Sequence, residues 1–299
     1  MTGYIDLVAN LYTPAEVADG LSTIDDHFKA QVRMDPEIWN GVPIAKYIEK
    51  KDKAGIERTF LAAARMGDLR VRGSVHIPYE RVHKVCTDYP ARFSGLAGID
   101  PTLGMKQLYD LEYAVKELGF IGAHYYPHWF DIAPDHPYIF PIYAKCIELD
   151  IPIMMQVGQN LIYQQDRRLP TVARPITLDR VAIHFPELRL IGMHLGVPWT
   201  DEMIAMSWKH PNIYIGGDAY APKHWPKQIV QYANTYGQDK FMFGTDWTVV
   251  DPIRAVNDVL TLNFRPGPLK KIMRDNAWRV FKLDQRLKQS LSTARAAGF

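Results

Sequence analysis

Two residues whose chemistry suits proton transfer stand near the ends of apolar runs in this 299-residue chain. They are His194, in the run 189–196, and Asp246, in the run 241–247. An imidazole or a carboxylate within an apolar strand costs free energy unless it is hydrogen-bonded, charge-paired or metal-bound. Both residues, together with His124, are therefore candidate catalytic groups. The alternatives are a core histidine bonded to a carbonyl for His194 and a structural loop cap for Asp246.

Eight β-branched or aromatic runs must position these side chains, and a segment with helical spacing separates each run from the next. The runs are 4–10, 58–62, 93–100, 120–127, 152–158, 189–196, 212–219 and 241–247. Alternating strands and helices predict an α/β fold, a (β/α)8 TIM barrel that forms a single domain over residues 1–283, followed by a C-terminal helical tail over 284–299. A doubly wound sheet is disfavoured because residues 8–12 lack a Gly-rich phosphate turn.

The polar residues at the ends of the predicted strands are expected to meet at one mouth. In a barrel of this kind the active site forms at the C-terminal ends of the strands. Asn10 ends the first predicted strand, and Gln156 stands near the end of the fifth. We therefore expect Asn10 and Gln156 to share one solvent-accessible pocket with His194 and Asp246.

The composition favours a globular protein with a small-molecule substrate. Hydrophobic residues make up 47% of the chain, the formal net charge is +2, and no run of Lys or Arg indicates nucleic acid or a membrane surface as a partner. No segment approaches the roughly 20 apolar residues that span a bilayer. Cys86 and Cys146 stand in helical, apolar segments and are expected to be reduced thiols, so we expect a cytoplasmic protein.

Three linked motifs resemble one known family. Residues 185–196 read FPELRLIGMHLG, residues 243–247 read FGTDW, and residues 276–283 read NAWRVFKL. Motifs of this kind in this order are similar to the amidohydrolase superfamily, in the branch that contains aminocarboxymuconate-semialdehyde decarboxylase. The resemblance runs from Tyr4 to Leu283 and implies a barrel enzyme.

The metal ligands that the resemblance implies are mostly replaced. The family commonly carries an aspartate and a His-x-His pair at strand one, histidines at strands five and six, and an aspartate at strand eight. Here Asp6 is kept, but Val8, Asn10 and Gln156 stand where three of the histidines would be. Valine has no donor atom and amide carbonyls are weak neutral ligands, so we predict no metal and no other cofactor, although Asp218 could be recruited as a ligand.

Without a metal, hydrogen-bond donors must stabilise charge on the substrate. Asn10, Gln156 and either His124 or His194 could bind the oxyanion of a substrate carbonyl, while Asp246 acts as general base on water. The resulting prediction is a metal-independent hydrolase that cleaves a C–O, C–S or C–C bond next to an activated carbonyl. Suitable compounds are a lactone, a thioester such as an aromatic β-ketoacyl-CoA, or a 1,3-dicarbonyl.

Three further residues are expected to bind the substrate. Tyr125 and Trp247 offer aromatic faces, and Arg174 offers a guanidinium to a carboxylate or phosphate. The expected partner is thus a small aromatic or carboxylate-bearing molecule, with a homodimer as a further possibility because related barrels often pair. Two alternative functions stay open: a decarboxylase of an aromatic or muconate-type acid, as in several relatives, and a ligand-binding barrel without catalysis.

Overall fold

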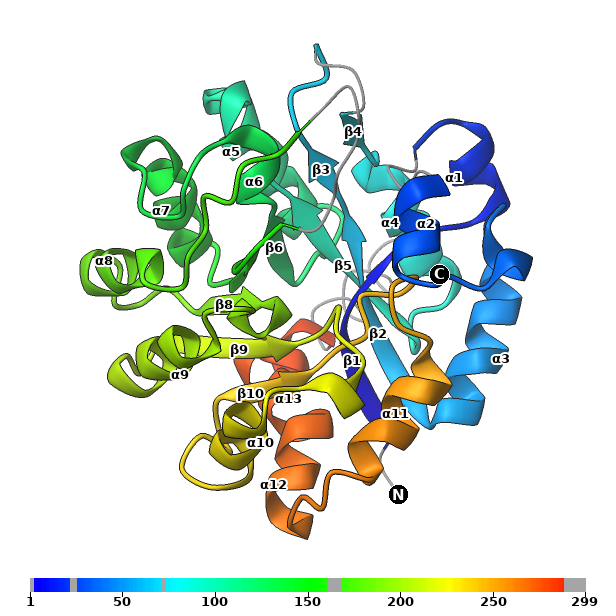
Figure 1. Cartoon of the computed structure of the whole chain (residues 1–299). Coiled ribbons are helices and arrows are strands. Elements are labelled where there is room, and N and C mark those ends of the chain that lie inside the picture. Colours follow the sequence, from blue (N-terminus) through cyan, green and yellow to red (C-terminus); the bar gives the residue numbers. More distant parts are fainter. Residues whose placement is uncertain (1–2, 22–25, 71–73, 161–167, 288–299) are drawn as a thin grey trace.

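Eight strands form one sheet in the order β1-β2-β5-β6-β7-β8-β9-β10, and neighbouring strands in it are parallel (Figure 1). The computed structural model describes residues 3–21, 26–70, 74–160 and 168–287. The strands are β1 (Tyr4–Asn10), β2 (Ile56–Ala63), β5 (Phe93–Gly98), β6 (Gly122–Tyr125), β7 (Ile153–Gln156), β8 (Leu190–Met193), β9 (Ile213–Gly217) and β10 (Phe241–Phe243). Strands β3 (Arg65–Met66) and β4 (Val75–His76) form a separate antiparallel hairpin.

The first and last strands meet just beyond the end of β10. Asn10 donates its backbone N–H to Trp247 O at 2.6 Å, and Asp246 donates its backbone N–H to Val8 O at 3.1 Å. Ala9 and Trp247 form an isolated parallel bridge at the same place. The predicted (β/α)8 barrel in a single domain is confirmed, and Asp246 lies at its seam.

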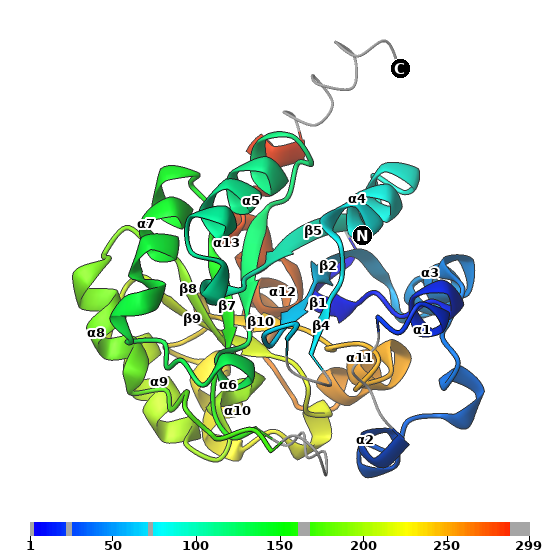
Figure 2. The ribbon, with the colours of Figure 1, turned by 90° about the horizontal axis from the view of Figure 1, so that it is seen from above.

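Helices follow the strands and surround the sheet (Figure 2). The longer helices are α3 (Ile44–Ala54), α4 (Tyr79–Asp88), α5 (Met105–Lys116), α7 (Phe140–Glu148), α8 (Thr177–His184), α9 (Thr200–Lys209), α10 (Lys227–Asn234) and α11 (Pro252–Leu260). The shorter ones are α1 (Pro14–Ala18), α2 (Asp26–Gln31), α6 (Pro127–Phe130), α12 (Pro266–Lys270) and α13 (Asn276–Val280). A π-helical turn over Lys271–Asp275 joins the last two.

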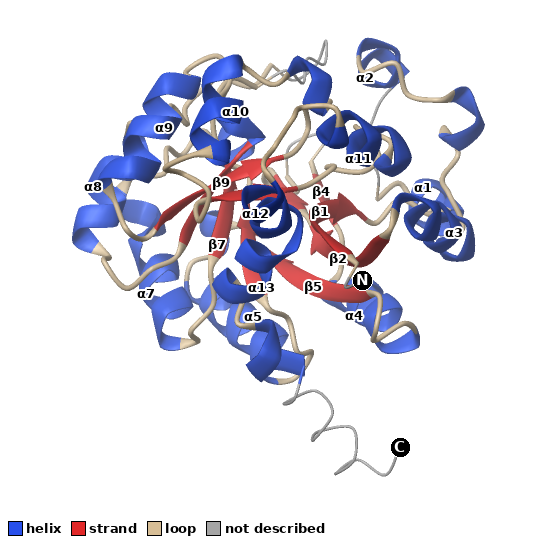
Figure 3. Ribbon diagram, turned by 90° about the horizontal axis from the view of Figure 1, so that it is seen from below, coloured by secondary structure: helices blue, strands red, loops and turns tan. Residues whose placement is uncertain are grey.

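The inside of the barrel is packed with apolar side chains. Those that fill it include Leu7, Phe60, Met154, Met193 and Met242. Helices α12 and α13 lie across the N-terminal ends of the strands (Figure 3), and the rings of Phe281 and Phe60 pack 4.6 Å apart. Because this end is covered, the opposite end is the one at which side chains can meet a substrate.

Two of the predicted runs continue past the strands that they contain. The run 189–196 holds the 4 residues of β8 and then a 3₁₀ turn over His194–Gly196, and the run 241–247 holds the 3 residues of β10. His194 and Asp246 have φ angles of 60° and 50°, which no β-strand contains. Both candidate residues therefore stand on loops that leave the strands.

Part of the predicted C-terminal tail can be compared with the structure. Residues 283–287 are helical, whereas 288–299 lie outside the described residues, so the boundary at residue 283 stays a prediction. Cys86 in α4 and Cys146 in α7 are free thiols. Across the described ranges, no helix is both long enough and apolar enough to cross a membrane.

Candidate active site

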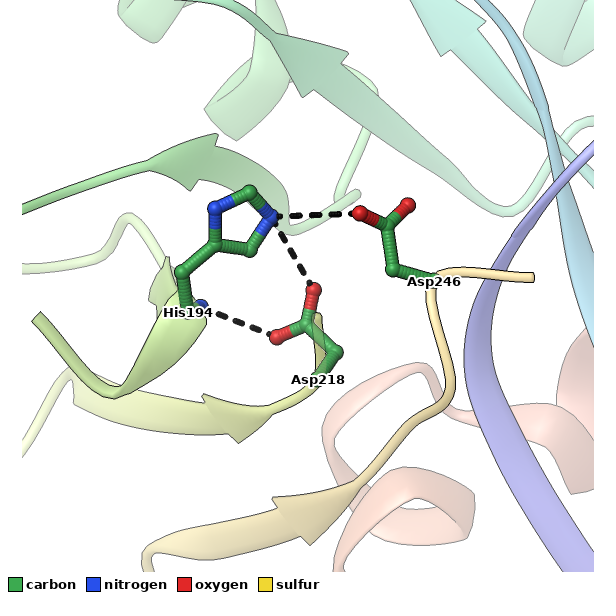
Figure 4. Close-up of side chains that lie close together, drawn as sticks. All are labelled: His194, Asp218 and Asp246. Carbon is green, nitrogen blue, oxygen red and sulfur yellow. Dashed lines mark hydrogen bonds and ion pairs between the residues drawn. The ribbon is translucent and has the colours of Figure 1, made fainter. Parts of the chain in front are cut away.

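Three ionisable side chains, which we call the mouth cluster, meet where β8, β9 and β10 end (Figure 4). They are His194, Asp218 and Asp246. His194 Nε2 lies 3.4 Å from Asp218 Oδ2 and 3.6 Å from Asp246 Oδ2. The Asp218 side chain is fully buried, whereas those of His194 and Asp246 are 11% and 13% exposed. Solvent therefore reaches the cluster at His194 and Asp246.

Asn10, the last residue of β1, fixes one oxygen of Asp246. The Nδ2 of Asn10 donates to Asp246 Oδ1 at 3.0 Å and to Trp247 O at 2.9 Å. These two bonds use both N–H groups of the amide. The second oxygen of Asp246, Oδ2, faces His194.

His194 is held by residues from β7 and from the end of β9. Gln156 places its Nε2 3.3 Å from His194 Nδ1, and the backbone N–H of His194 donates to Asp218 Oδ1 at 3.0 Å. Two glycines make room for Asp218, because a Cβ on Gly216 would lie 2.9 Å from its Oδ1 and a Cβ on Gly244 would lie 3.0 Å from its Cβ. The structure thus brings Gln156 to His194 and Asn10 to Asp246, as the ends of the predicted strands indicate.

Asp6 of β1 positions the segment that carries Asp246. Its buried carboxylate accepts the backbone N–H of Thr245 at 2.8 Å and the Thr245 hydroxyl at 2.7 Å. Thr245 Oγ1 accepts the N–H of Trp247 at 3.0 Å. These bonds hold both neighbours of Asp246, whose left-handed conformation costs about 1–3 kcal/mol for a non-glycine residue. Strain of this kind is typical of functional sites.

Burial changes the acidity of all three members of the mouth cluster. It raises the pKa of Asp218, although the His194 backbone N–H opposes the rise. It also raises the pKa of Asp246, where His194 and Asn10 oppose the rise and the charge of Asp218 adds to it. Burial lowers the pKa of His194, against the charge of Asp246. Both carboxyls therefore hold protons more tightly than exposed aspartates do, and the imidazole holds its proton less tightly than an exposed histidine.

His124 of β6 is a fourth polar group close to the cluster. It is buried, and neither ring nitrogen has a hydrogen-bond partner among the described residues. Burial and the nearby His194 lower the pKa of His124 to about 3, so the ring is neutral and carries one N–H donor. The ring of Tyr126 packs edge-on against it with centroids 4.3 Å apart. A buried imidazole without a partner needs an explanation, and a bound ligand supplies one.

Tyr125 does not face the mouth cluster, contrary to its predicted role in substrate binding. It alternates with His124 along β6, so its ring points out of the barrel. There its hydroxyl donates to Ile132 O at 2.9 Å and its ring stacks on Phe130. The next residue, Tyr126, packs its ring against His124 instead, and burial together with the charges of Asp246 and Asp218 raises its pKa well above the usual value.

The other two residues predicted to bind substrate through their side chains also have different partners. The ring of Trp247 stacks on Tyr47 of α3 with centroids 5.1 Å apart, which turns it away from Asp246. Arg174 pairs with Glu202 of α9 and lies over the ring of Trp199 at 5.1 Å. Neither side chain has a contact with the mouth cluster among the interactions of the described residues.

Asn10 and Gln156, the predicted oxyanion donors, also have partners within the protein. Asn10 gives both of its amide N–H groups to Asp246 and Trp247, and the Gln156 amide faces His194 Nδ1. These amides orient the catalytic candidates. Among the described residues, the ring N–H of His124 is one donor that remains for a substrate oxygen.

Two residues near the site were not among the predicted site residues. Asp218 follows the Gly216-Gly217 pair in the predicted strand 212–219, so the sequence places it at the mouth and as a possible recruited ligand, but not as a catalytic or substrate-binding residue. His128 in α6 accepts the N–H of Val172 on Nδ1 at 3.1 Å, and burial together with His194 lowers its pKa to about 4. Its sequence signal is its place just beyond the predicted strand 120–127, which indicates a position near the mouth of the barrel.

The positions at which the family resemblance implies metal ligands do not suit an ion. Val8 is buried and apolar, and Asn10 presents its amide N–H groups, not its oxygen, to Asp246. The donor atoms of the mouth cluster form a different set, and they all lie within 4.8 Å of one another. If an ion binds in this barrel, these are the residues whose chemistry fits it.

The fold is shared with several solved structures. An uncharacterised TIM-barrel protein from Bordetella bronchiseptica is 23% identical, with 95% of this chain and 99% of that chain covered and a TM-score of 0.76. The 2,6-dihydroxybenzoate decarboxylase from Rhizobium is 20% identical, with coverage of 95% and 100% and a TM-score of 0.68. The 5-carboxyvanillate decarboxylase from Novosphingobium aromaticivorans, complexed with manganese and 4-hydroxy-3-methoxy-5-nitrobenzoic acid, is 17% identical, with coverage of 93% and 96% and a TM-score of 0.68.

The sequence comparisons agree with the motifs described above. No curated protein matches the chain. The model of a family described as amidohydrolase matches residues 62–283, which include the segments that carry His124, Gln156 and the whole mouth cluster. Because this match covers well over half of the chain, the protein belongs to the amidohydrolase family.

Proposed function

We propose that the protein is a carboxy-lyase that removes CO₂ from a small aromatic acid at the mouth cluster. The observation that carries this proposal is the placement of Asp246, whose Oδ1 is tied to Asn10 while its Oδ2 faces His194 Nε2 at 3.6 Å. A carboxyl held beside an imidazole in this way is suited to deliver a proton to a carbon atom. Fold neighbours named as decarboxylases of 2,6-dihydroxybenzoate and 5-carboxyvanillate support the class of substrate.

The reaction needs one proton and releases one CO₂. The bond between the ring carbon and the carboxylate carbon breaks, and its electron pair stays on the ring carbon. Asp246 gives the proton that forms the new C–H bond and becomes a carboxylate beside His194. Solvent then returns a proton to Asp246, whose side chain is 13% exposed.

The surroundings of the cluster favour loss of a charged carboxylate as a neutral molecule. His124 is a buried, neutral donor, and its N–H can hold a carboxylate or hydroxyl oxygen of the substrate. Exclusion of water from such a site destabilises the substrate carboxylate more than it destabilises CO₂. His124 is therefore assigned to substrate binding and Asp246 to proton transfer.

Hydrolysis of an activated carbonyl, which the sequence favours, has weaker support. That reaction needs several N–H donors for the oxyanion, and Asn10 has none left to give. Asp246 could still act as a base on water. The two reactions can be distinguished by their products, because only decarboxylation releases CO₂.

The test uses purified full-length protein, kept free of chelators. It is incubated with benzoic acids that carry a hydroxyl next to the carboxylate and, in parallel, with an aromatic lactone and an aromatic β-ketoacyl-CoA. We expect CO₂ and the decarboxylated phenol in equal amounts from at least one acid. In D₂O the same phenol should exchange its ring hydrogen at the protonated carbon, and Asp246→Asn should lose both reactions. Cleavage of the lactone or thioester without any release of CO₂ from the acids would overturn the proposal.

A further inference from the structure

We infer that Tyr47 of α3 is a positioning residue that holds Asp246 toward His194 through its stack on Trp247. The inference deepens the proposed function and rests on it in one respect, since it takes Asp246 as the group that transfers the proton. Its structural part is the hold of α3 on the segment that carries Asp246, and this part is measured without any substrate.

The ring of Tyr47 joins the loop after β10 to the wall of the barrel. It stacks on Trp247 with centroids 5.1 Å apart and an interplanar angle of 12°. It also stacks on Phe93 of β5 with centroids 6.1 Å apart and an angle of 23°. Each of the three residues is only 2% exposed. Because buried aromatic pairs favour defined separations and orientations, these stacks fix the place of the Trp247 ring relative to β5.

Two lysines of α3 add cationic contacts to the same rings. Lys51 Nζ lies 4.0 Å from the centroid of Phe93, and Lys50 Nζ lies 5.4 Å from the centroid of Trp247. Lys50 also forms an ion pair with Asp251, which lies at the start of α11. Helix α3 therefore contacts the loop between β10 and α11 at Trp247 and again at Asp251, and the first contact is at the residue next to Asp246.

The place of Trp247 affects Asp246 directly because the two residues share a peptide bond. Asp246 has a φ angle of 50°, and a non-glycine residue keeps such a conformation only when its surroundings hold it there. The hydroxyl of Thr245 and the side chain of Asn10 bond the backbone of Trp247. Tyr47 holds the side chain of Trp247. Loss of this stack would let Trp247 shift and would change the direction in which Asp246 Oδ2 points.

The hydroxyl of Tyr47 takes no part in this contact. It is buried and has no hydrogen-bond partner among the described residues. The positioning role therefore belongs to the flat ring, so phenylalanine should serve as well as tyrosine and an aliphatic side chain should not. A side chain that only filled space would allow leucine with a loss of stability and no separate effect on Asp246.

The first test measures backbone hydrogen exchange by mass spectrometry in the full chain. Asp246 N–H donates to Val8 O at 3.1 Å and Val249 N–H donates to Asp246 O at 2.8 Å, so both amides report on this loop. In Tyr47→Leu we expect exchange within residues 244–250 to become about tenfold faster, because the loop opens locally more often. Tyr47→Phe should exchange like wild type. If Tyr47→Leu does not fold, Tyr47→Met, with an unbranched and adaptable side chain, replaces it.

The second test measures turnover of an aromatic acid that the wild type decarboxylates. Tyr47→Leu should lower kcat by about 10-fold or more and leave KM within about twofold, because it misplaces Asp246 without touching the substrate. Tyr47→Phe should restore kcat. The matched control is Tyr232→Leu in α10, where a ring that is 1% exposed packs edge-on against Tyr236 with centroids 4.8 Å apart. This control should lower the thermal midpoint and leave both kcat and the exchange of residues 244–250 unchanged.

The two tests separate the inference from the proposed function. Unchanged exchange of residues 244–250 in Tyr47→Leu would overturn the inference, and so would an equal loss of kcat in Tyr232→Leu. Faster exchange together with wild-type kcat in Tyr47→Leu would also overturn it, because the loop would then move without effect on proton transfer. Faster exchange in a protein that decarboxylates none of the acids would uphold the hold of α3 on the loop and count against the proposed function alone.

Discussion

Asn10 and Asp246 are 236 residues apart in the sequence and are joined by a 3.0 Å hydrogen bond across the seam of the barrel. The same Asn10 side chain bonds Trp247 O, so one amide ties the first strand to the loop after the last strand. This arrangement decides which oxygen of Asp246 is left to face His194. A position that commonly carries a metal-binding histidine in the family is used here to orient a carboxylate.

Substitutions of Asn10 should therefore lower the free energy of unfolding, and Asn10→Asp should lower it more than Asn10→Ala does. Asn10→Ala leaves Asp246 Oδ1 and Trp247 O without this donor and should lower the free energy of unfolding by about 1–3 kcal/mol. Asn10→Asp places a second carboxylate 3.0 Å from Asp246 Oδ1, so its loss should be larger and should grow as pH rises. Chemical denaturation at pH 5 and pH 8 measures both effects. An Asn10→Asp protein as stable as wild type at pH 8 would show that the bond does not matter.

Asp246→Asn tests the proton-transfer role. The amide oxygen can still accept from Asn10, so the fold should persist with little change in thermal midpoint. The variant has no acidic proton to give, and the turnover of any aromatic acid found to be a substrate should fall by about 10²-fold or more. Steady-state kinetics with CO₂ detection provides the measurement. Wild-type turnover in Asp246→Asn would remove the proposed mechanism, whatever the substrate.

The barrel could be predicted from the sequence because the same strand–helix pattern occurs repeatedly along the chain. Eight β-branched runs separated by helical spacing indicate the fold even when each boundary is uncertain. The convergence of Asn10, Gln156, His194 and Asp246 followed from the order of strands alone, because the C-terminal ends of parallel strands meet at one end of a barrel.

Whether an individual side chain faces the mouth cluster could not be predicted in the same way. Asp218 belongs to the mouth cluster because two glycines let it approach, and Tyr125 leaves the site because it alternates with His124. Trp247 adjoins Asp246 in sequence, yet its ring stacks on a helix. Each outcome depends on tertiary packing or on a left-handed backbone turn, and neither leaves a periodic pattern in the sequence.

Asp6 should make stability depend on pH. Burial raises its pKa from 3.8 to about 7, against the bonds from Thr245 and the charge of Lys51. A carboxyl with a raised pKa stabilises the fold fully below about pH 4, where both states are protonated, and this contribution is lost as pH rises through about 7. Tyr47, whose own pKa is raised, and Lys51 are the titratable groups coupled to it.

The measurement compares wild type with Asp6→Asn by urea unfolding between pH 4 and pH 8. Because asparagine does not titrate, the stability of wild type relative to the variant should be greatest at pH 4, decline as pH rises to about 7 and level off above it. Lys51 is present in both proteins, so most of its own pH dependence cancels. A difference that stays constant across this range would mean that Asp6 does not titrate there.

Tyr125 and Tyr126 form a matched pair that separates packing from function. Tyr125→Phe removes the hydrogen bond to Ile132 O outside the barrel, so it should lower the free energy of unfolding by about 1 kcal/mol and leave kcat and KM unchanged. Tyr126→Phe removes a buried hydroxyl whose pKa the charges of Asp246 and Asp218 raise, so it should change KM or kcat severalfold with little effect on stability. Both variants keep the ring, which preserves the stacking of Tyr125 on Phe130 and the edge contact of Tyr126 with His124. If Tyr125→Phe were the variant that altered turnover, substrate would have to bind on the outer face of β6, and the placement of the active site at the mouth cluster would be wrong.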